Sequence, residues 1–404
     1  MPIKRALSAL SPKSGNIKTE QHPMVYDQSG CAECRKPFTF MRRRAQCQGS
    51  CGKPVCAGCV SYCVMPEQHR NAGKKENFGL IKCCRECFIN ASSIDFDAQF
   101  EMVGAAAATA SCLCVMLHGG GGSRKQWSVQ VRDMAKADPT LRFALVDLSA
   151  HGSRMDVALD LHTEIDRLVQ LLSPGSGVVT GLYPHTPVVL FGYSLGGYLA
   201  MQFAGDKRGR ELVDAAVVCS AGQNVGLASS FKARLGLKVM SFAFKHVSEE
   251  RLLVAMMKMA TKNPHISREA VEDTVLRAGA FFHRADDHIA LLRATCPTRT
   301  LPHFRKPVLF INGELDHRDY EEEFLESVTS GASERVRRLC ALHVLPGADH
   351  FLASDERFMQ PFAKLMGDFV REHVKRVPGA ALPEGASAVE KLLLRAWDRV
   401  NTVT

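Results

Sequence analysis

Six short apolar runs constrain the fold of this 404-residue chain more than any other feature. Amphipathic stretches of helical character separate them. The runs are CLCVML at 112–117, FALVDL at 143–148, PVVLFG at 187–192, DAAVVCSA at 214–221, PVLFIN at 307–312 and LHVL at 342–345. Strands buried on both faces are near-continuously apolar, and their alternation with helices is typical of a parallel sheet. We therefore expect an α/β fold, with a mostly parallel sheet and helices on both faces, over residues 95–375.

The other segments differ from this pattern in composition. Residues 1–24 are polar without periodicity and predict a disordered tail, whereas residues 25–90 form a cysteine-rich module. The alternation of apolar runs with amphipathic stretches is interrupted at about 224–300, where a helical lid over the sheet is expected. Its helices are predicted at Ser248–Lys262 and Ser267–Arg277, and residues 376–404 predict a linker followed by a short C-terminal helix.

Charge and hydropathy limit the classes of function. The start of the chain lacks the apolar run of a secretory signal, and the stretch 103–117 is too short to span a membrane, so a cytoplasmic setting is expected. Residues 1–94 hold 15 Lys/Arg and 6 Asp/Glu, which accounts for the whole formal net charge of +9. This basic region favours an anionic partner such as a phosphoinositide membrane. It lacks the interleaved aromatic residues of a nucleic-acid surface, so no nucleic acid is expected.

The motif GYSLGG lies between an apolar run and a helix-like segment. Small residues at 192 and 196 permit the sharp strand–turn–helix geometry that exposes the hydroxyl of Ser194. A glycine run, HGGGGS, follows the first strand, and its backbone N–H groups could approach a substrate oxygen. We predict Gly120 and Leu195 as oxyanion-hole donors. The alternative, a phosphate-binding loop, lacks the Lys-Ser/Thr and GxGxxG patterns of such loops.

Two further polar residues follow in the order Ser, Asp, His. NGELD places Asp316 just after a predicted strand, with Glu314 as the alternative acid, and GADHF places His350 in a later loop. In this arrangement His350 removes the Ser194 proton and Asp316 orients the imidazole.

These motifs resemble the α/β-hydrolase superfamily. LHGGGGSRKQWSVQ, ALVDLSAHGSR, GYSLGG, NGELD and GADHF match its successive segments over residues 112–375. The resemblance implies a serine hydrolase that works through an acyl-enzyme. Together with the apolar lid, it suggests a hydrophobic ester or lipid substrate. A non-catalytic, membrane-associated binding or scaffold protein with the same fold is the alternative.

Ten of the 15 cysteines lie between Cys31 and Cys87. Clustered cysteines in a reducing compartment indicate metal rather than disulfides. The CxxC spacings provide eight thiolates for two structural Zn²⁺ ions, with Cys63 and Cys83 spare and Cys83 able to replace Cys84. The predicted ligands are Cys31, Cys34, Cys47, Cys51, Cys56, Cys59, Cys84 and Cys87.

The cysteine spacing resembles the FYVE zinc-finger family. By this resemblance the ligands interleave: the first and third pairs (31, 34, 56, 59) hold one ion, and the second and fourth (47, 51, 84, 87) hold the other. The family binds phosphatidylinositol 3-phosphate on endosomal membranes, which would make this protein peripheral to them. The implied lipid-binding residues are Arg42, Arg43 and Arg44, with Phe40 and Met41 contacting the membrane.

Several positions depart from the FYVE pattern, and the family's WxxD opening is represented only by Met24 and Asp27. Ala45 and Gln46 stand where the family has a histidine pair, and Gln48 stands where it has an arginine. Cys47 and Cys51 are also one residue further apart than in the family. A finger that serves only protein interaction or ubiquitin transfer therefore remains an alternative.

Overall fold

The computed structural model describes residues 29–48, 51–56, 59–64, 80–87, 99–182, 186–222, 263–267, 285–316 and 321–374, and individual residues between 235 and 258. The predicted tail at 1–24, the linker and helix at 376–404, and most of the predicted lid lie outside the described residues. Among the described helices, none combines the length and apolarity needed to cross a bilayer.

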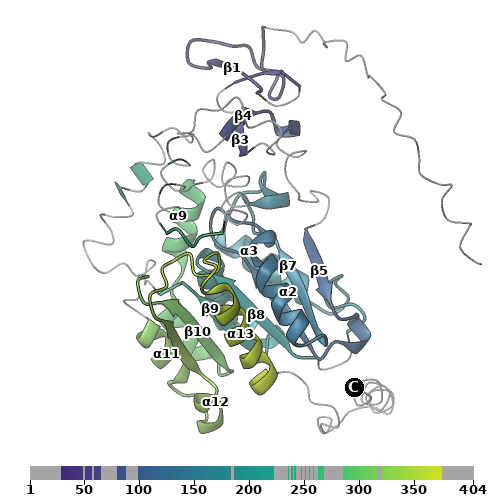
Figure 1. Ribbon diagram of the computed structural model, residues 1–404, viewed down its shortest axis with the longest axis vertical. Helices are drawn as coiled ribbons and strands as arrows, with labels where there is room; N and C mark the ends of the chain where they lie inside the picture. Colours follow the sequence, from purple (N-terminus) through teal and green to yellow (C-terminus); the bar gives the residue numbers. More distant parts are fainter. Residues whose placement is uncertain are drawn as a thin grey trace, which may run out of the picture.

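A seven-stranded sheet forms the centre of the larger part of the chain, in the order β11-β10-β9-β8-β6-β7-β5 (Figure 1). All neighbouring strands are parallel except β5, which pairs with β7 in the antiparallel sense. The strands are β5 (Phe100–Gly104), β6 (Cys112–Leu117), β7 (Leu141–Val146), β8 (Val188–Tyr193), β9 (Ala215–Cys219), β10 (Val308–Gly313) and β11 (Ala341–Leu345).

Successive side chains of β6 enter two different cores. Leu113, Val115 and Leu117 belong to one apolar cluster, whereas Cys112, Cys114 and Met116 belong to the other. A strand with both faces buried must be apolar at every position, because its side chains alternate between the faces. This explains the unbroken apolar runs in the sequence.

Helices cover both faces of the sheet (Figure 1). Helices α2 (Ser128–Ala137) and α13 (Met359–Phe369) pack together over one face, with Trp127 and Phe362 stacked at a centroid distance of 6.3 Å. Helices α3 (Leu161–Leu172), α4 (Leu195–Gly205) and α11 (Glu321–Thr329) cover the other face. The shorter helices are α5 (Gly209–Leu212), α9 (Ala285–Ala294), α10 (Pro297–Thr300) and α12 (Glu334–Arg338).

The six predicted strands are all present: CLCVML coincides with β6, and the other five have shifted ends. Strand β7 stops at Val146 rather than Leu148, because the backbone leaves the sheet at Asp147. The carboxylate of Asp147 accepts hydrogen bonds from the backbone N–H groups of Arg124 and Ser153 at 2.8 and 3.0 Å. Strand β5 was not predicted, since it lies at the sheet edge and its residues are only half-buried.

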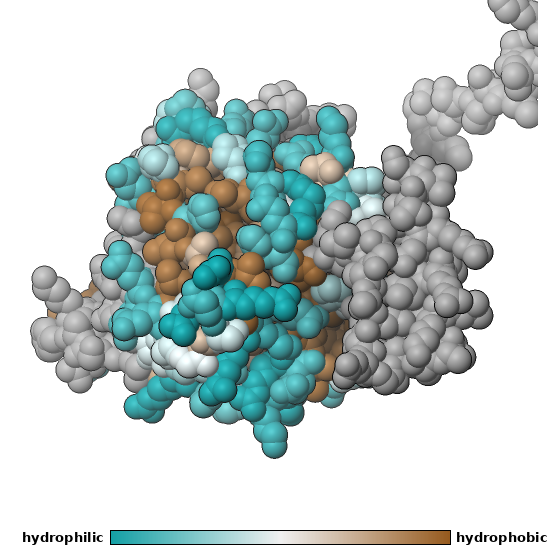
Figure 2. Space-filling model, turned by 90° about the horizontal axis from the view of Figure 1, so that it is seen from below, coloured by the Kyte–Doolittle hydropathy of each residue, from teal (hydrophilic) through white to brown (hydrophobic). Residues whose placement is uncertain are grey.

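Figure 2 shows the molecule from below, from the side on which the parallel strands begin. On this face apolar residues gather in one broad area with hydrophilic residues around it. The opposite, carboxyl ends of the strands point toward the cysteine-rich module (Figure 1).

The cysteine-rich module contains two small antiparallel sheets. Strand β1 (Arg44–Gln46) pairs with β2 (Pro54–Cys56), and β3 (Ser61–Val64) pairs with β4 (Leu80–Cys83). An ion pair between Arg85 and Asp156 joins this module to the sheet domain. Met155 packs beside the module's buried cysteines, so the junction has both a charged and an apolar part.

Candidate active site and metal centres

Ser194 lies in a tight turn between β8 and α4. Its φ of 49° falls in the left-handed region, which is strained for a residue with a side chain. The turn requires glycine on both sides: a Cβ on Gly192 would lie 2.2 Å from the oxygen of Gly196, and one on Gly196 would lie 2.4 Å from the oxygen of Leu117. The backbone therefore holds the hydroxyl of Ser194 at the carboxyl end of the sheet.

The structure brings three of the predicted residues together in one hydrogen-bonded chain. The Nε2 atom of His350 lies 3.1 Å from Oγ of Ser194. On its other side, Nδ1 of His350 lies 3.0 Å from both carboxylate oxygens of Asp316. The Asp316 side chain is 3% exposed and the His350 side chain 43%, so the acid is buried while the imidazole stays accessible to a substrate.

Glu314, the alternative acid, has a different partner. Its Oε2 atom accepts the backbone N–H of Gly347 at 2.8 Å, and the residue is exposed. This bond ties together the loops after β10 and β11, which carry Asp316 and His350.

The glycine run after β6 leaves one backbone donor available. The N–H groups of Gly119, Gly121 and Gly122 donate to Gln126 Oε1, His151 Nε2 and the oxygen of Gly119, at 2.8, 3.1 and 3.1 Å. Within the described part of the chain, the N–H of Gly120 has no such bond. Leu195 is the first residue of α4, where an N–H has no intrahelical acceptor. Among the described residues, neither of the two predicted oxyanion donors has a hydrogen-bond acceptor.

Two buried histidines brace this loop. His118 donates from Nδ1 to the oxygen of Gly119 at 2.8 Å, and its Nε2 accepts the N–H of Leu148 at 3.0 Å. His151 donates from Nδ1 to the oxygen of Ser149 at 2.8 Å, while Nε2 accepts from the loop. Burial holds the pKa of His151 well below its usual range, which keeps Nε2 free to accept.

The sequence did not reveal two side chains beside the site. The hydroxyl of Tyr193 donates to the carbonyl of His350 and so fixes the loop that carries the imidazole. His288, from α9, packs so closely over the oxyanion loop that a Cβ on Gly120 would lie 2.4 Å from its Cε1. Burial lowers the pKa of His288 to about 4, so its imidazole is neutral near pH 7. In the sequence, only the position of His288 within the expected lid could have suggested that it lies beside the site.

These two depressed histidine pKa values predict a loss of stability in acid. An unfolded histidine titrates near pH ~6.5, so below that pH the unfolded state binds protons that the native His151 and His288 exclude. We expect the free energy of unfolding to fall as the pH drops from about 6.5 toward 4, with His288 contributing about 1–2 kcal/mol at pH ~5. Denaturant unfolding at pH values near 7.5 and 5 measures this fall.

A pair of control variants separates the contribution of the buried histidine from a general loss of stability at low pH. His288→Gln should flatten part of the pH dependence, whereas His343→Gln should not, because His343 is exposed on β11. Equal pH dependence in the wild type and His288→Gln would contradict the assignment.

Comparison with known proteins identifies the family of this domain. A family model described as the alpha/beta hydrolase family matches residues 114–365, more than half of the chain. The chain belongs to the α/β hydrolase family. The matched residues include Ser194, Asp316 and His350, and they run from β6 into α13.

Solved structures agree with this assignment. A bromoperoxidase from Bacillus anthracis is 18% identical with a TM-score of 0.54, covering 68% of this chain and 95% of that one. A thermophilic esterase from Thermogutta terrifontis is 18% identical with a TM-score of 0.51, covering 69% and 93%. An enol-lactonase from Burkholderia xenovorans LB400 is 14% identical with a TM-score of 0.50, covering 68% and 96%. At these identities the similarity shows the α/β-hydrolase fold.

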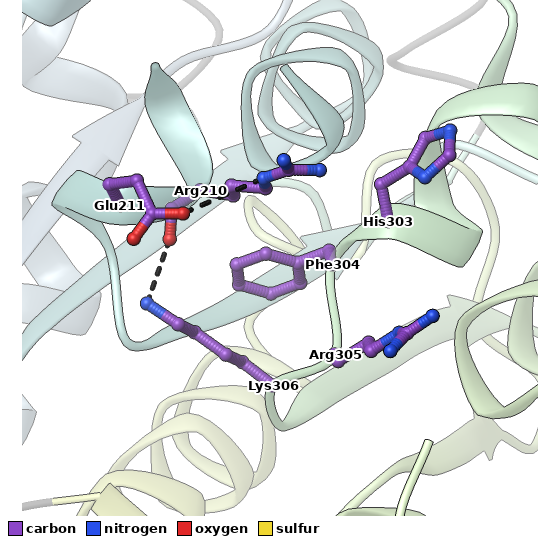
Figure 3. Close-up of a pocket in the computed structure, with 6 residues that line it drawn as sticks. All are labelled: Arg210, Glu211, His303, Phe304, Arg305 and Lys306. Carbon is purple, nitrogen blue, oxygen red and sulfur yellow. Dashed lines mark hydrogen bonds and ion pairs between the residues drawn. The ribbon is translucent and has the colours of Figure 1, made fainter. Parts of the chain in front are cut away.

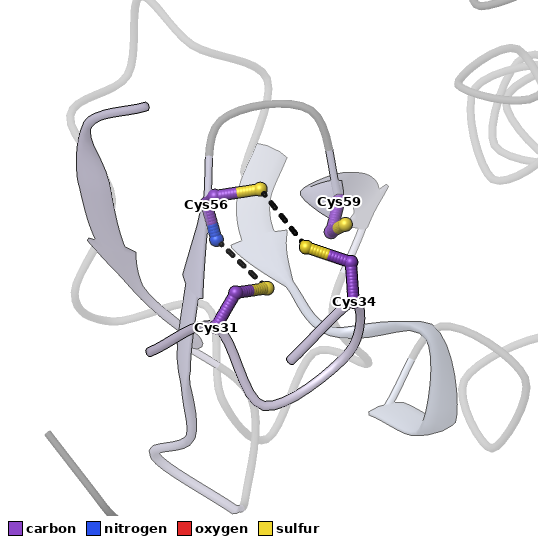
Figure 4. Close-up of side chains that lie close together, drawn as sticks. All are labelled: Cys31, Cys34, Cys56 and Cys59. Carbon is purple, nitrogen blue, oxygen red and sulfur yellow. Dashed lines mark hydrogen bonds between the residues drawn. The ribbon is translucent and has the colours of Figure 1, made fainter. Parts of the chain in front are cut away.

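In the module that precedes the hydrolase domain, eight cysteines form two groups of four. One holds Cys31, Cys34, Cys56 and Cys59 and the other Cys47, Cys51, Cys84 and Cys87, and within each group the sulfur atoms lie within 4.8 Å of one another. Figure 4 shows the four thiols of the first group turned toward a common centre. Both groups could hold a metal ion, and their membership is the interleaved pairing that the resemblance implied.

The sulfur geometry fits a tetrahedral ion. A Zn–S bond of about 2.3 Å places tetrahedral ligands about 3.8 Å apart. The Sγ atoms of Cys34 and Cys56 are 3.9 Å apart, and those of Cys51 and Cys84 are 3.4 Å apart. The N–H of Cys56 also donates to Sγ of Cys31 at 3.2 Å, a bond that supports a ligating thiolate.

The residues predicted to contact a membrane form an exposed tip. Phe40 and Met41 are 84% and 88% exposed, and the guanidinium of Arg43 lies 5.7 Å from the centre of the Phe40 ring. Arg44 begins β1, opposite Cys56. Gln48 has a structural partner instead, because its Oε1 accepts the N–H of Lys82 at 2.7 Å and links β4 to the segment after β1.

Proposed function

We propose that this protein is a serine hydrolase that cleaves carboxylic esters. The observation that carries the proposal is the imidazole of His350, hydrogen-bonded to Ser194 on one side and to Asp316 on the other. A serine hydroxyl is a weak nucleophile unless a base removes its proton, and such a base needs a third group to fix its tautomer. The hydrogen bonds of His350 support these roles for Ser194, His350 and Asp316.

The proposed reaction has two halves. Nδ1–H of His350 donates to Asp316, which leaves Nε2 to take the proton of Ser194 as its oxygen attacks the ester carbonyl. The N–H groups of Gly120 and Leu195 stabilise the oxyanion, and the imidazolium gives its proton to the departing alcohol. Water, deprotonated by the same imidazole, then releases the acid from the acyl-enzyme.

A hydrophobic ester or lipid is the proposed substrate class. Leu315, directly before Asp316, is 69% exposed, and Val239 and Phe242 in the lid region are 59% and 64% exposed. Isolated exposed apolar residues are common, but Leu315 lies next in sequence to Asp316, which contacts the imidazole of His350. The similarity to a thermophilic esterase is in keeping with ester chemistry.

A panel of p-nitrophenyl esters of increasing acyl length tests this proposal. The purified full chain should hydrolyse them, with kcat/KM rising from acetate toward medium chains as the acyl group buries more apolar surface. Stoichiometric binding of the same esters without turnover would instead support the scaffold alternative.

We further propose that the cysteine-rich module is a two-zinc finger of the FYVE type that directs the hydrolase to endosomal membranes containing phosphatidylinositol 3-phosphate. The exposed apolar tip at Phe40 and Met41 lies beside Arg42, Arg43 and Arg44, which suits insertion between lipids with pairing to phosphate. Ala45 and Gln46 supply no charge to such a site.

Liposome flotation tests this targeting. Phosphatidylinositol 3-phosphate should increase the floating fraction of the full chain, and Arg42→Ala/Arg43→Ala/Arg44→Ala should remove the increase. A matched triple variant on α12, at the exposed arginines 335, 337 and 338, changes the net charge equally and should behave as the wild type. Flotation that is indifferent to the lipid would favour a protein-interaction finger.

A further inference from the structure

A recess lies at the opposite end of the sheet from Ser194. Its lining comes from α5 and from the segment 303–306, which leads into β10. The nearby strands β9 and β10 begin here and end at the carboxyl edge, where Asp316 follows β10. The recess is therefore separate from the proposed ester site. It is lined by Arg210, Glu211, His303, Phe304, Arg305 and Lys306.

The lining is strongly cationic. Arg210, Arg305 and Lys306 are positive at neutral pH, and Glu211 is the one carboxylate among the lining residues. The Glu211 carboxylate lies 3.6 Å from Nε of Arg210, but its side chain is 76% exposed, so solvent screens this pair. Among the described residues, Arg305 has no ion pair that would neutralise its guanidinium.

The ammonium group of Lys306 is held in place by the backbone. Its Nζ donates to the carbonyl oxygens of Arg210 and Val213, both at 2.7 Å, and its nearest carboxylate, Asp214, is 3.9 Å away. Neutral carbonyl partners fix the position of the charge without cancelling it. A side chain that is already held in one position loses little conformational entropy when an anion binds to it.

The lining also includes an aromatic residue. Figure 3 shows the Phe304 ring in the middle of the group, with Glu211 and Lys306 on one side and His303 and Arg305 on the other. Phe304 is fully buried in the apolar core, so its ring anchors the segment that carries His303, Arg305 and Lys306 and is not itself a contact surface. The cavity, about 390 Å³, is in the range of small-molecule sites and much larger than a bare phosphate ion requires.

We propose that this recess binds the phosphate group of a small phosphorylated molecule. Two arginines can each bind phosphate through two parallel N–H donors, and the lysine adds a point charge, which matches a phosphate dianion better than a single carboxylate. The site is independent of ester hydrolysis at Ser194.

Calorimetric titration of the full chain at low ionic strength tests the proposal, with glycerol 3-phosphate as the probe. One molecule should bind per chain. Arg305→Ala should weaken binding about tenfold, as expected for loss of one charge-assisted contact, and Arg210→Ala/Arg305→Ala should abolish it. Arg335→Ala on α12 removes an equal charge outside the recess and should bind as the wild type.

Two further arms identify the source of the phosphate. Equal affinity for inorganic phosphate would support the site and identify its ligand as the free phosphate ion. Binding only to vesicles that contain phosphatidic acid would also support the site and identify its ligand as a lipid headgroup. Arg305 is exposed, so its replacement should leave the thermal midpoint and Ser194 labelling by a fluorophosphonate unchanged. No saturable binding in any arm, or equal affinity in the wild type and the double variant, would overturn the proposal.

Discussion

Ser194→Ala should lower kcat for ester hydrolysis by about ten-thousand-fold to a million-fold, with the fold intact. The hydroxyl lies 3.1 Å from the imidazole of His350, which can remove its proton as the oxygen attacks the ester carbonyl. The side chain makes no capping bond to α4, so its removal should cost little stability. Turnover of a p-nitrophenyl ester, measured together with the thermal midpoint, separates the two effects.

Ser220→Ala is the matched control. Ser220 follows the neighbouring strand β9, is buried, and has a similar φ of 50°. It should retain turnover, because within the described part of the chain the hydroxyl of Ser220 makes no hydrogen bond to His350. A Ser194→Ala enzyme within tenfold of the wild type would mean that another group is the nucleophile.

The roles of the two candidate acids can be separated by how much each substitution lowers kcat. Asp316→Asn keeps the shape but offers the wrong hydrogen-bonding partner to Nδ1 of His350, so a loss of about ten-thousand-fold in kcat is expected. Glu314→Gln should have a small effect, because Glu314 bonds the backbone of Gly347 rather than the imidazole.

Removal of zinc should unfold the cysteine-rich module. Each structural Zn²⁺ contributes about 10–16 kcal/mol of apparent binding free energy at pH 7, far more than a module this small obtains from its core. The native chain should contain two zinc ions by elemental analysis. A strong chelator should release both and make residues 25–90 sensitive to protease, while the hydrolase sheet stays resistant.

Adjacent cysteines provide a matched pair for this experiment. Cys84 belongs to the second group of four, whereas Cys83 is equally buried but belongs to neither. Cys84→Ser should lose one zinc ion per chain and Cys83→Ser should keep two. The reverse result would exchange their roles, and a native chain without zinc would contradict the metal assignment.

The sequence predicted the buried strands well and their edges poorly. CLCVML coincides with β6, because a strand buried on both faces must be apolar throughout. FEMVG contains a glutamate, lies at the edge of the sheet and is only half-buried, so β5 has no comparable signal. The end of β7 depends on bonds that Asp147 makes with Arg124 and Ser153, and a local pattern cannot contain them.

Residues around the candidate site were predictable only where a motif fixes their backbone. Ser194 could be placed because GYSLGG specifies its turn. The contacts of Tyr193 with the His350 loop and of His288 with Gly120 join residues far apart in sequence, and they depend on how the lid and loops pack. Gln48, taken as a lost lipid ligand, instead bonds Lys82, a long-range contact that no spacing indicates.

Labelling with a fluorophosphonate, followed by peptide mass spectrometry, measures most directly whether this hydrogen-bonded chain is a working nucleophile. One adduct per protein should form on the peptide that contains Ser194, and it should be absent from Ser194→Ala and slow to form in His350→Ala. A folded wild type that stays unlabelled, or an adduct on a different residue, would leave this protein with the fold of a hydrolase and without the proposed chemistry.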